Sequence, residues 1–396
     1  MKTQKVWKAE DIIGLVPDEL LDNLTMETGV DYSVQKLHGK TIFKLFLYAF
    51  LSGSQISLRL LEHLFKSQNF RALFTIKPTT IKHSAFSMRL NHIKADYFEK
   101  IFLHLIHSPK LDSVLFDRKK VSVSKIDTTI VTLSSKLLRF GLDDNKGYKT
   151  LKFGVTIKAS IPVQVICMSN NQRYLSEDNA LPPLIYQTKQ KNALNIAIFD
   201  RGVQRKQNFA NFNKEHIYFI SRLSTQKVAV AQELPLVDTE TPTLTVLRDQ
   251  MITFANKDNL QDRDENTIFR LVTGRSKETG QEVKFLTNVD FLNATEIANL
   301  YKSRWEIETF FKFIKQQLNF NHLLSRNENG IKVVMYLTMI AAILLTLYKQ
   351  FNNIMGWAIA KLKFLDELFS NTRDIWQHGF PTYPGLQAAT IKSNSS

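Results

Sequence analysis

The chain of 396 residues contains a single cysteine, Cys167. One cysteine excludes an internal disulfide bond and a zinc site built from several cysteines, and it fits a reducing compartment such as the cytosol. Glycine and proline are also scarce, with 14 and 10 residues. Because 44% of the residues are apolar, we expect a soluble protein with a sizeable packed core rather than a disordered chain.

Long hydrophobic runs are equally rare. The most apolar run extends from Val333 to Tyr348, and it is shorter than the ~20 residues that a membrane-spanning helix needs. It therefore predicts a buried core helix, with a membrane span as the weaker alternative. The first 17 residues lack a continuous apolar stretch, so we expect no secretory signal.

Acidic residues are in the minority. The chain has 37 Asp and Glu against 52 Lys and Arg, which gives a formal charge of +15 and an isoelectric point near 9.6. A strongly basic protein gains free energy by releasing counterions from a polyanion, so nucleic acid is the simplest partner. The charge alone defines only a class of partner, because ribosomal and membrane-surface proteins share it.

The pattern of apolar residues divides the chain. Residues 1–117 repeat apolar positions three and four apart, which predicts an all-α N-terminal domain. Within it, residues 57–92 fit a helix-turn-helix in which Lys82 and Arg89 contact DNA. A plain helical bundle with a polar face explains the same residues equally well.

A β-rich region follows, and it predicts an α/β core. Residues 118–223 begin with a strand that carries Asp127, continue through a hairpin, and reach a short strand, IAIF, that is apolar on both faces and ends at Asp200. Residues 224–290 are predicted to form a β-rich insertion. Helices resume over residues 291–350, and residues 351–396 form a tail of mixed helix and loop.

The most informative stretch is LYKSRWEIETFFKFIKQQL, residues 300–318, which predicts one continuous helix. Its apolar residues cover one face, as in a helix packed on a core. An ordinary solvated face with one ion pair is the alternative interpretation. At about 100° per residue, four polar residues fall within roughly a 60° sector beside the apolar face: Tyr301, Arg304, Glu308 and Lys315.

Three carboxylates stand at the ends or edges of predicted core elements: Asp127, Asp200 and Glu308. Such a set suits two Mg²⁺ ions, which activate the attacking oxygen and stabilise the leaving oxygen in a displacement at phosphorus. Each residue also has an ordinary explanation: Asp127 as a strand-edge charge, Asp200 as a helix cap and Glu308 as part of a surface ion pair. Their joint placement favours a site.

These motifs together resemble a known family. The spacing Tyr-x2-Arg-x3-Glu-x6-Lys in residues 301–315, with I-D-T-T around Asp127 and F-D-R-G around Asp200, is similar to the DDE transposases of bacterial insertion sequences. The resemblance is to the cut-and-paste group with the Tyr-Arg-Glu-Lys signature, and it covers residues 121–348. It implies a ribonuclease H-like core with a β-rich insertion between its fifth strand and the helix that carries Glu308.

The resemblance also implies a chemistry. Asp127, Asp200 and Glu308 would be catalytic and would bind two Mg²⁺ ions, for which Mn²⁺ is a substitute. Double-stranded DNA would be the partner, as terminal inverted repeats and as target, with a homodimer on paired ends and no membrane, in the bacterial cytoplasm at the nucleoid. The remaining signature residues, Tyr301, Arg304 and Lys315, would contact DNA phosphates and help to hold a flipped base.

In this family an aromatic residue of the insertion often stacks on the flipped base. The insertion here has no tryptophan, so the candidates are Phe254, Phe269 and Phe285. Two other functions fit the same motifs. One is a ribonuclease H-like nuclease that cuts without joining, and the other is a domesticated, non-catalytic DNA-binding protein.

Overall fold

The computed structural model describes most of the chain. The described residues are 6–53, 55–74, 76, 80–115, 122–133, 141–143, 149–189, 194–224, 226–254, 268–325 and 327–370. The predicted domain boundary between residues 117 and 118 and residues 371–396 of the predicted tail lie outside these ranges. The other predicted domain boundaries stay predictions.

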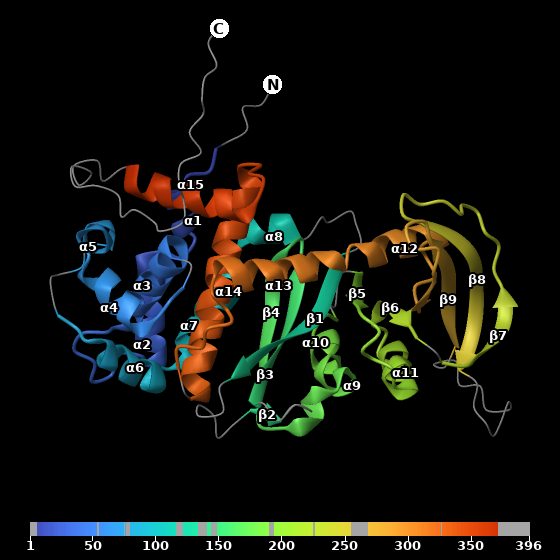
Figure 1. Ribbon diagram of the computed structural model, residues 1–396, viewed down its shortest axis with the longest axis horizontal. Helices are drawn as coiled ribbons and strands as arrows, with labels where there is room; N and C mark the ends of the chain where they lie inside the picture. The colour runs from blue at the N-terminus through green and yellow to red at the C-terminus, as the bar shows by residue number, and fades with distance from the viewer. Residues whose placement is uncertain are drawn as a thin grey trace, which may run out of the picture.

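A single ten-stranded sheet runs through the described part of the chain, in the order β2-β3-β1-β5-β6-β10-β9-β8-β7, with β4 paired to β3 (Figure 1). Its strands are β1 Ser122–Leu133, β2 Leu142–Asp143, β3 Lys149–Lys158, β4 Ile161–Met168, β5 Asn195–Phe199, β6 Tyr218–Leu223, β7 Val228–Glu233, β8 Leu244–Phe254, β9 Ile268–Ser276 and β10 Glu282–Thr287.

Five strands, β4-β3-β1-β5-β6, form the core of the sheet. β3 runs antiparallel to β1 and β4, whereas β5 is parallel to both β1 and β6. The hairpin between β3 and β4 turns at Ala159 and Ser160, whose φ angles of 46° and 65° match the twist of a two-residue hairpin loop. Every residue of β5 is buried, as predicted for a central strand. The predicted α/β fold is confirmed.

The predicted insertion contains β7 to β10, and these strands extend the same sheet because β10 pairs with β6. Sequence patterns missed β7, whose residues are mostly exposed and therefore lack a clear apolar face. A buried ion pair braces this region, since Arg270 contacts Asp249 at 2.7 Å. Arg270 also donates to the carbonyls of Val289 and Leu292, and so ties the insertion to the chain that leads into the signature helices.

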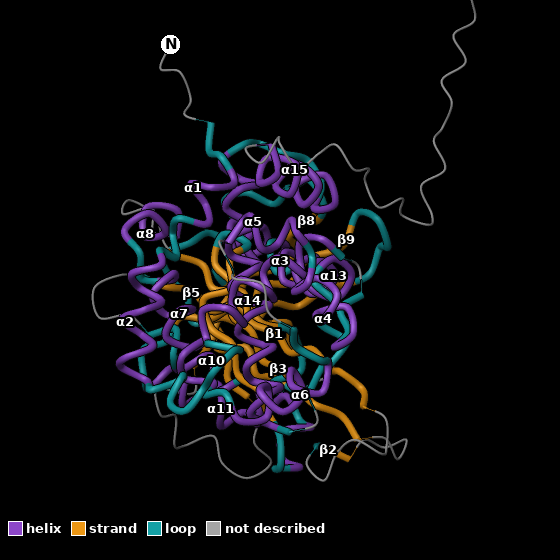
Figure 2. The backbone as a smooth tube through the Cα atoms, turned by 90° about the vertical axis from the view of Figure 1, so that its left-hand side faces the viewer, coloured by secondary structure: helices purple, strands orange, loops and turns teal. Residues whose placement is uncertain are grey.

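Helices cover the sheet and fill the side of the molecule that faces the viewer in Figure 2. The prediction of helices throughout the N-terminal region is confirmed. The N-terminal helices are α1 Ala9–Ile13, α2 Asp18–Thr28, α3 Gly39–Ser52, α4 Leu58–Lys66, α5 Gln68–Phe74, α6 His83–His92, α7 Ala95–Ile106 and α8 Pro109–Leu115. Those of the core and C-terminal region are η1 Gln172–Leu175 (a 3₁₀ helix), α9 Glu177–Ala180, α10 Pro182–Tyr186, α11 Lys206–Lys214, α12 Ala294–Lys302, α13 Trp305–Gln317, α14 Glu328–Phe351 and α15 Trp357–Ser370.

The longest helix, α14, is the centre of the largest hydrophobic cluster. The N-terminal helices, α13, α15 and one face of β3 all pack into this cluster. α14 has 24 residues, longer than the apolar run that marks it in the sequence, because polar residues extend it at both ends. Its most apolar window is 94% buried inside the protein, so the prediction of a core helix is confirmed.

Candidate active site

Two of the three carboxylates come from neighbouring strands of the core. The parallel pairing of β1 with β5 brings Lys125 beside Ile198. Continued two residues beyond this last pair, the register brings Asp127 next to Asp200, and the charge of Asp200 acts on the Asp127 carboxylate. Asp200 follows the last residue of β5, at the carboxyl edge where ligands gather in sheets covered by helices.

The third carboxylate lies on a helix that differs from the prediction. The single helix predicted over residues 300–318 is wrong, because α12 ends at Lys302 and α13 begins at Trp305. At the break, the Ser303 hydroxyl donates to the Leu300 carbonyl at 2.7 Å, which competes with regular helical bonding. The N–H groups of Ser303 and Arg304 each bond three residues back, in a tighter 3₁₀-like turn.

The predicted apolar face of α13 is nevertheless confirmed. The five residues assigned to it are all buried in the structure: Ile307, Phe310, Phe311, Ile314 and Leu318. Lys125 on β1, itself buried, contacts Glu306 at 3.1 Å and so ties the first turn of α13 to the strand of Asp127. In Figure 1, α12 and α13 cross the ends of the core strands.

Arg304 joins two of the acids. Its Nη2 lies 2.6 Å from Glu308 Oε1, and its Nη1 lies 3.8 Å from Asp127 Oδ2. The alternative of a solvated ion pair does not describe this contact, because Arg304 is only 7% exposed. The break between α12 and α13 therefore turns a helix-surface arginine into a bridge between Glu308 and the sheet.

Tyr301 holds the remaining acid, because its hydroxyl donates to Asp200 Oδ1 at 2.9 Å. Burial and the charge of Asp200 raise the pKa of Tyr301 above its ordinary value, so the phenol stays protonated and remains a donor. The Phe285 ring packs on the Tyr301 ring at 4.9 Å. The signature residues thus contact all three carboxylates.

The two aspartates have different acidities. Burial raises the pKa of Asp127 to about 6, against the opposing effects of the Thr128 N–H and Arg304, and the charges of Glu177 and Asp200 add to the rise. Burial also acts upward on the pKa of Asp200, but the Arg201 N–H, Arg304 and Tyr301 outweigh it and the net direction is downward. Both aspartates can be anionic at neutral pH, with Asp127 the more easily protonated.

The residue types at this edge of the sheet, three carboxylates, are those that suit a divalent cation. Within the described ranges, no three His, Cys, Asp or Glu side chains are grouped closely enough to hold a metal ion, and the Arg304 guanidinium lies between Asp127 and Glu308. Carboxylate oxygens are nevertheless the ligands that Mg²⁺ and Mn²⁺ prefer. Because the charges of Glu177 and Asp200 oppose ionisation of Asp127, added positive charge here is favourable.

The other predicted DNA contacts are spread over the molecule. Lys315 lies two helical turns beyond Glu308 on α13, half-buried, and burial lowers its pKa. Lys82 is exposed directly before α6. Lys82 and Arg89 thus lie on the N-terminal helices, whereas Lys315 lies on α13. The roles of all three in DNA binding stay predictions.

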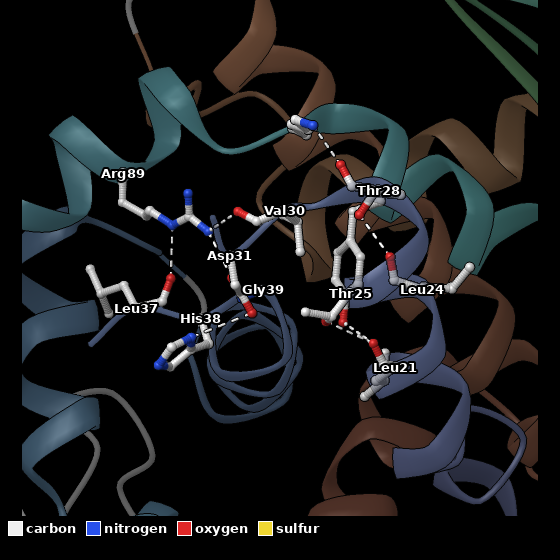
Figure 3. A network of polar contacts seen from close by, with 12 residues as sticks. Leu21, Leu24, Thr25, Thr28, Val30, Asp31, Leu37, His38, Gly39 and Arg89 are labelled. Carbon is white, nitrogen blue, oxygen red and sulfur yellow. Dashed lines mark hydrogen bonds and ion pairs between the residues drawn. The ribbon is translucent and has the colours of Figure 1, made fainter. Parts of the chain in front are cut away.

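Arg89 has an internal role that its sequence position did not indicate. Figure 3 shows its guanidinium between α6 and the loop after α2. Its Nε donates to the Leu37 carbonyl at 2.8 Å, and its Nη2 donates to the Val30 carbonyl at 2.9 Å and to Asp31 at 3.0 Å. These bonds hold the N-terminal helices together, so any DNA contact by Arg89 would have to use its remaining N–H groups.

The aromatic candidates in the insertion are largely buried. Phe269 and Phe285 are 1% and 3% exposed, and Phe254 packs against Phe209 and Phe269. By contrast Trp305, directly after Arg304, is 64% exposed. The sequence analysis did not consider Trp305, because its ring belongs to the signature stretch and not to the insertion.

A comparison with protein families identifies the core. The family model described as "Transposase DDE domain" matches residues 122–344, which includes Asp127, Asp200 and Glu308. The chain belongs to this family, so the resemblance that the motifs indicated is confirmed.

Curated relatives agree with the family. A Synechocystis protein named as a transposase for insertion sequence element IS4SA is 25% identical over 317 residues, 75% of this chain and 78% of that protein. A Geobacillus stearothermophilus protein named as a transposase for insertion sequence element IS5377 is 26% identical over 191 residues, 48% and 49% of the two chains. A structure of the piggyBac transposase synaptic complex with hairpin DNA aligns with a TM-score of 0.47 at 10% identity, over 97% of this chain and 84% of that one.

Proposed function

We propose that this transposase binds the terminal inverted repeats of its own element, cleaves DNA at the element ends and joins the freed 3′-hydroxyl to target DNA. The observation that carries the proposal is the convergence of Asp127 and Glu308 on one buried guanidinium, beside Asp200. Carboxylates near one edge of the sheet suit a phosphodiester substrate through the divalent cations that they can bind, and the net charge of +15 favours a polyanion.

Asp127, Asp200 and Glu308 would hold two Mg²⁺ ions, with Mn²⁺ as a substitute. When bound, the cations would supply positive charge at the scissile phosphate and favour an in-line displacement. Asp127 and Asp200 must be anionic to receive them, and Tyr301 orients Asp200 through its hydrogen bond. Before DNA and the cations bind, the Arg304 guanidinium holds Glu308 and Asp127 together.

Arg304 and Lys315 would bind DNA phosphates. A guanidinium that leaves Asp127 and Glu308 presents paired N–H donors that match a phosphate, whereas the Lys315 ammonium acts as a compact charge. Exposed Lys82 is the corresponding candidate on the N-terminal helices. The exposed Trp305 ring, next to Arg304, would stack on an unpaired base at the DNA end.

The reaction exchanges one phosphorus–oxygen bond for another in each step. Water attacks the phosphorus at the element end, the bond to the 3′-oxygen breaks, and a free 3′-hydroxyl is left. That hydroxyl then attacks a target phosphodiester, and a target 3′-hydroxyl departs. Two copies of the chain would hold the paired ends, at the nucleoid in the bacterial cytoplasm.

The decisive experiment incubates the purified full-length protein and Mg²⁺ with labelled DNA that carries the inverted repeats flanking its coding region. We expect cleavage at the repeat ends and joining of the labelled 3′ strands to a target plasmid, both mapped by sequencing. Cleavage without joining would identify a nuclease. Repeat binding without any cleavage would identify a non-catalytic DNA-binding protein.

A further inference from the structure

A fourth acidic side chain, Glu177, lies beside the candidate active site and is not part of the signature motifs. Glu177 is the first residue of α9, on the segment that follows β4 and η1. Its Oε1 accepts a hydrogen bond from the Thr128 hydroxyl at 2.7 Å. Thr128 directly follows Asp127 on β1, and its N–H donates to the Asp127 carboxylate at 2.7 Å. Glu177 therefore holds the strand one residue away from Asp127.

A buried lysine fixes the position of Glu177. Lys152 on β3 donates to Glu177 Oε1 at 2.9 Å and to the Leu175 carbonyl at 2.7 Å. The Lys152 side chain is 2% exposed, and a lysine so deeply buried needs a paired charge. The Lys152–Glu177 pair thus links α9 to β3, and the Thr128 hydroxyl extends the link to β1.

The same segment touches the turn after Asp200. A Cβ atom placed on Gly202, two residues beyond Asp200, would lie 2.6 Å from the Glu177 Cγ, so this turn fits closely against the Glu177 side chain. The neighbouring Asp178 accepts hydrogen bonds from the N–H groups of Gln204 and Arg205, both at 2.8 Å. The start of α9 therefore contacts the chain near both aspartates.

The second oxygen of Glu177 distinguishes it from an ordinary structural glutamate. Glu177 Oε2 is buried and has no hydrogen-bond partner among the described residues. A buried carboxylate oxygen without a partner is unfavourable, so its presence calls for a reason. Glu177 Oε2 belongs to the carboxylate that Thr128 and Lys152 hold beside the strand of Asp127.

We propose that Glu177 is a positioning residue of the active site, which sets the spacing of Asp127 and Asp200 for a divalent cation by holding Thr128 and the Gly202 turn. This inference rests on the proposed function. Glu177 acts through these neighbours and does not contact DNA. Residues that orient the ligands of a metal typically change its affinity by 10- to 100-fold when they are removed.

The test measures Mn²⁺ binding to the full-length protein without DNA, by electron paramagnetic resonance titration of the free ion. We expect Glu177→Ala to weaken Mn²⁺ binding at least about 10-fold. Glu177→Gln keeps an oxygen for Thr128 and Lys152, and it should weaken binding less. The matched control Glu215→Ala, which removes an exposed glutamate paired with Lys189, should bind Mn²⁺ as the wild type does.

Unchanged Mn²⁺ affinity in a Glu177→Ala protein that melts cooperatively would overturn the inference. If that variant does not fold, Thr128→Val is the deciding variant, because it removes only the hydroxyl that donates a hydrogen bond to Glu177. Mn²⁺ affinity equal to that of the wild type in Thr128→Val would then overturn the inference. Asp127→Ala separates the two proposals. If Asp127→Ala binds Mn²⁺ as the wild type does, the proposed active site itself fails.

Discussion

The Tyr301 hydroxyl donates a hydrogen bond to Asp200, a residue 101 positions earlier in the chain. The bond joins the first residue of the signature to the end of the central strand. Because burial and the charge of Asp200 keep Tyr301 protonated, this donor is present over the whole physiological pH range. It orients the carboxylate from a helix that packs across the sheet.

Removing this donor should slow cleavage. For Tyr301→Phe we expect a loss of about 10-fold in the single-turnover cleavage rate, because a hydrogen bond to a charged group contributes roughly 1.5–3 kcal/mol. Binding to the inverted repeats should stay within about twofold of wild type. Tyr32→Phe is the control, since Tyr32 is 88% exposed. An unaltered rate in Tyr301→Phe would show that Asp200 needs no such orientation.

Each of the three carboxylates should be essential for DNA cleavage but not for binding to the inverted repeats. Asp127→Ala, Asp200→Ala and Glu308→Ala are expected to abolish cleavage while repeat binding persists, because the N-terminal helices and basic side chains remain intact. Gel-shift and cleavage assays on the same labelled repeat end check both properties. Cleavage retained in all three variants would refute the assignment of the site.

The raised pKa of Asp127 makes a pH-dependent contribution to stability. A folded pKa of about 6, above the ordinary 3.8, means that the folded protein binds the proton more tightly. Stability contributed by this group is therefore greatest below pH 3.8 and falls as pH rises toward 6. Above pH 6 the loss is complete, up to about 3 kcal/mol.

Asp127→Asn removes this ionisation, so the metal-free variant should be more stable than the wild type at pH 7.5. The difference should shrink as pH falls from 6 toward 4. Urea unfolding in EDTA at both pH values measures it. Equal free energies of unfolding of the two proteins at pH 7.5 would contradict the expected cost of ionising Asp127. Glu215→Gln serves as the control, because Glu215 is exposed and pairs with Lys189.

Lys315→Ala should weaken DNA binding through a lost phosphate contact. We expect a few-fold loss of affinity for cleaved ends and a slope of log K against log salt that is smaller by about 1. Arg304→Ala should lose more affinity for DNA, because it also leaves the Asp127 and Glu308 carboxylates without the guanidinium that contacts both. Fluorescence anisotropy over a salt series measures both variants. Lys189→Ala is the control. If Lys315→Ala and the wild type show the same salt slope, Lys315 does not contact a DNA phosphate.

Trp305→Ala tests whether the exposed ring stacks on a base. Because 64% of the residue is exposed, the substitution should change stability little, whereas stacking contributes roughly 1–3 kcal/mol per base. We expect about 10-fold weaker binding to ends with an unpaired terminal base, and less change for fully paired DNA. Trp305→Phe should recover part of the loss. Equal losses on both DNAs would indicate a backbone contact instead of stacking.

Much of the fold was accessible from local patterns. Alternation and β-branched residues marked β1 and the β3–β4 hairpin, and the apolar run over residues 195–199 marked the central strand, because burial on both faces requires such a run. Strand β7 was missed because its residues are mostly exposed. The helix break at Ser303 was missed because the apolar period of residues 300–318 continues across it. The Ser303 side chain bonds to the Leu300 carbonyl at the break, and such a bond leaves no mark on the apolar period.

The sequence by itself determined the residue types and spacings of the site: three carboxylates, and the Tyr-Arg-Glu-Lys signature of residues 301–315. Those features are local and can be read along the chain. Only the tertiary structure decided that Arg304 bridges Asp127 and Glu308, that Arg89 holds the N-terminal helices together, and that Glu177 braces the strand of Asp127. These contacts join residues far apart in the chain, and no spacing rule predicts which side chains meet when a sheet and its covering helices pack.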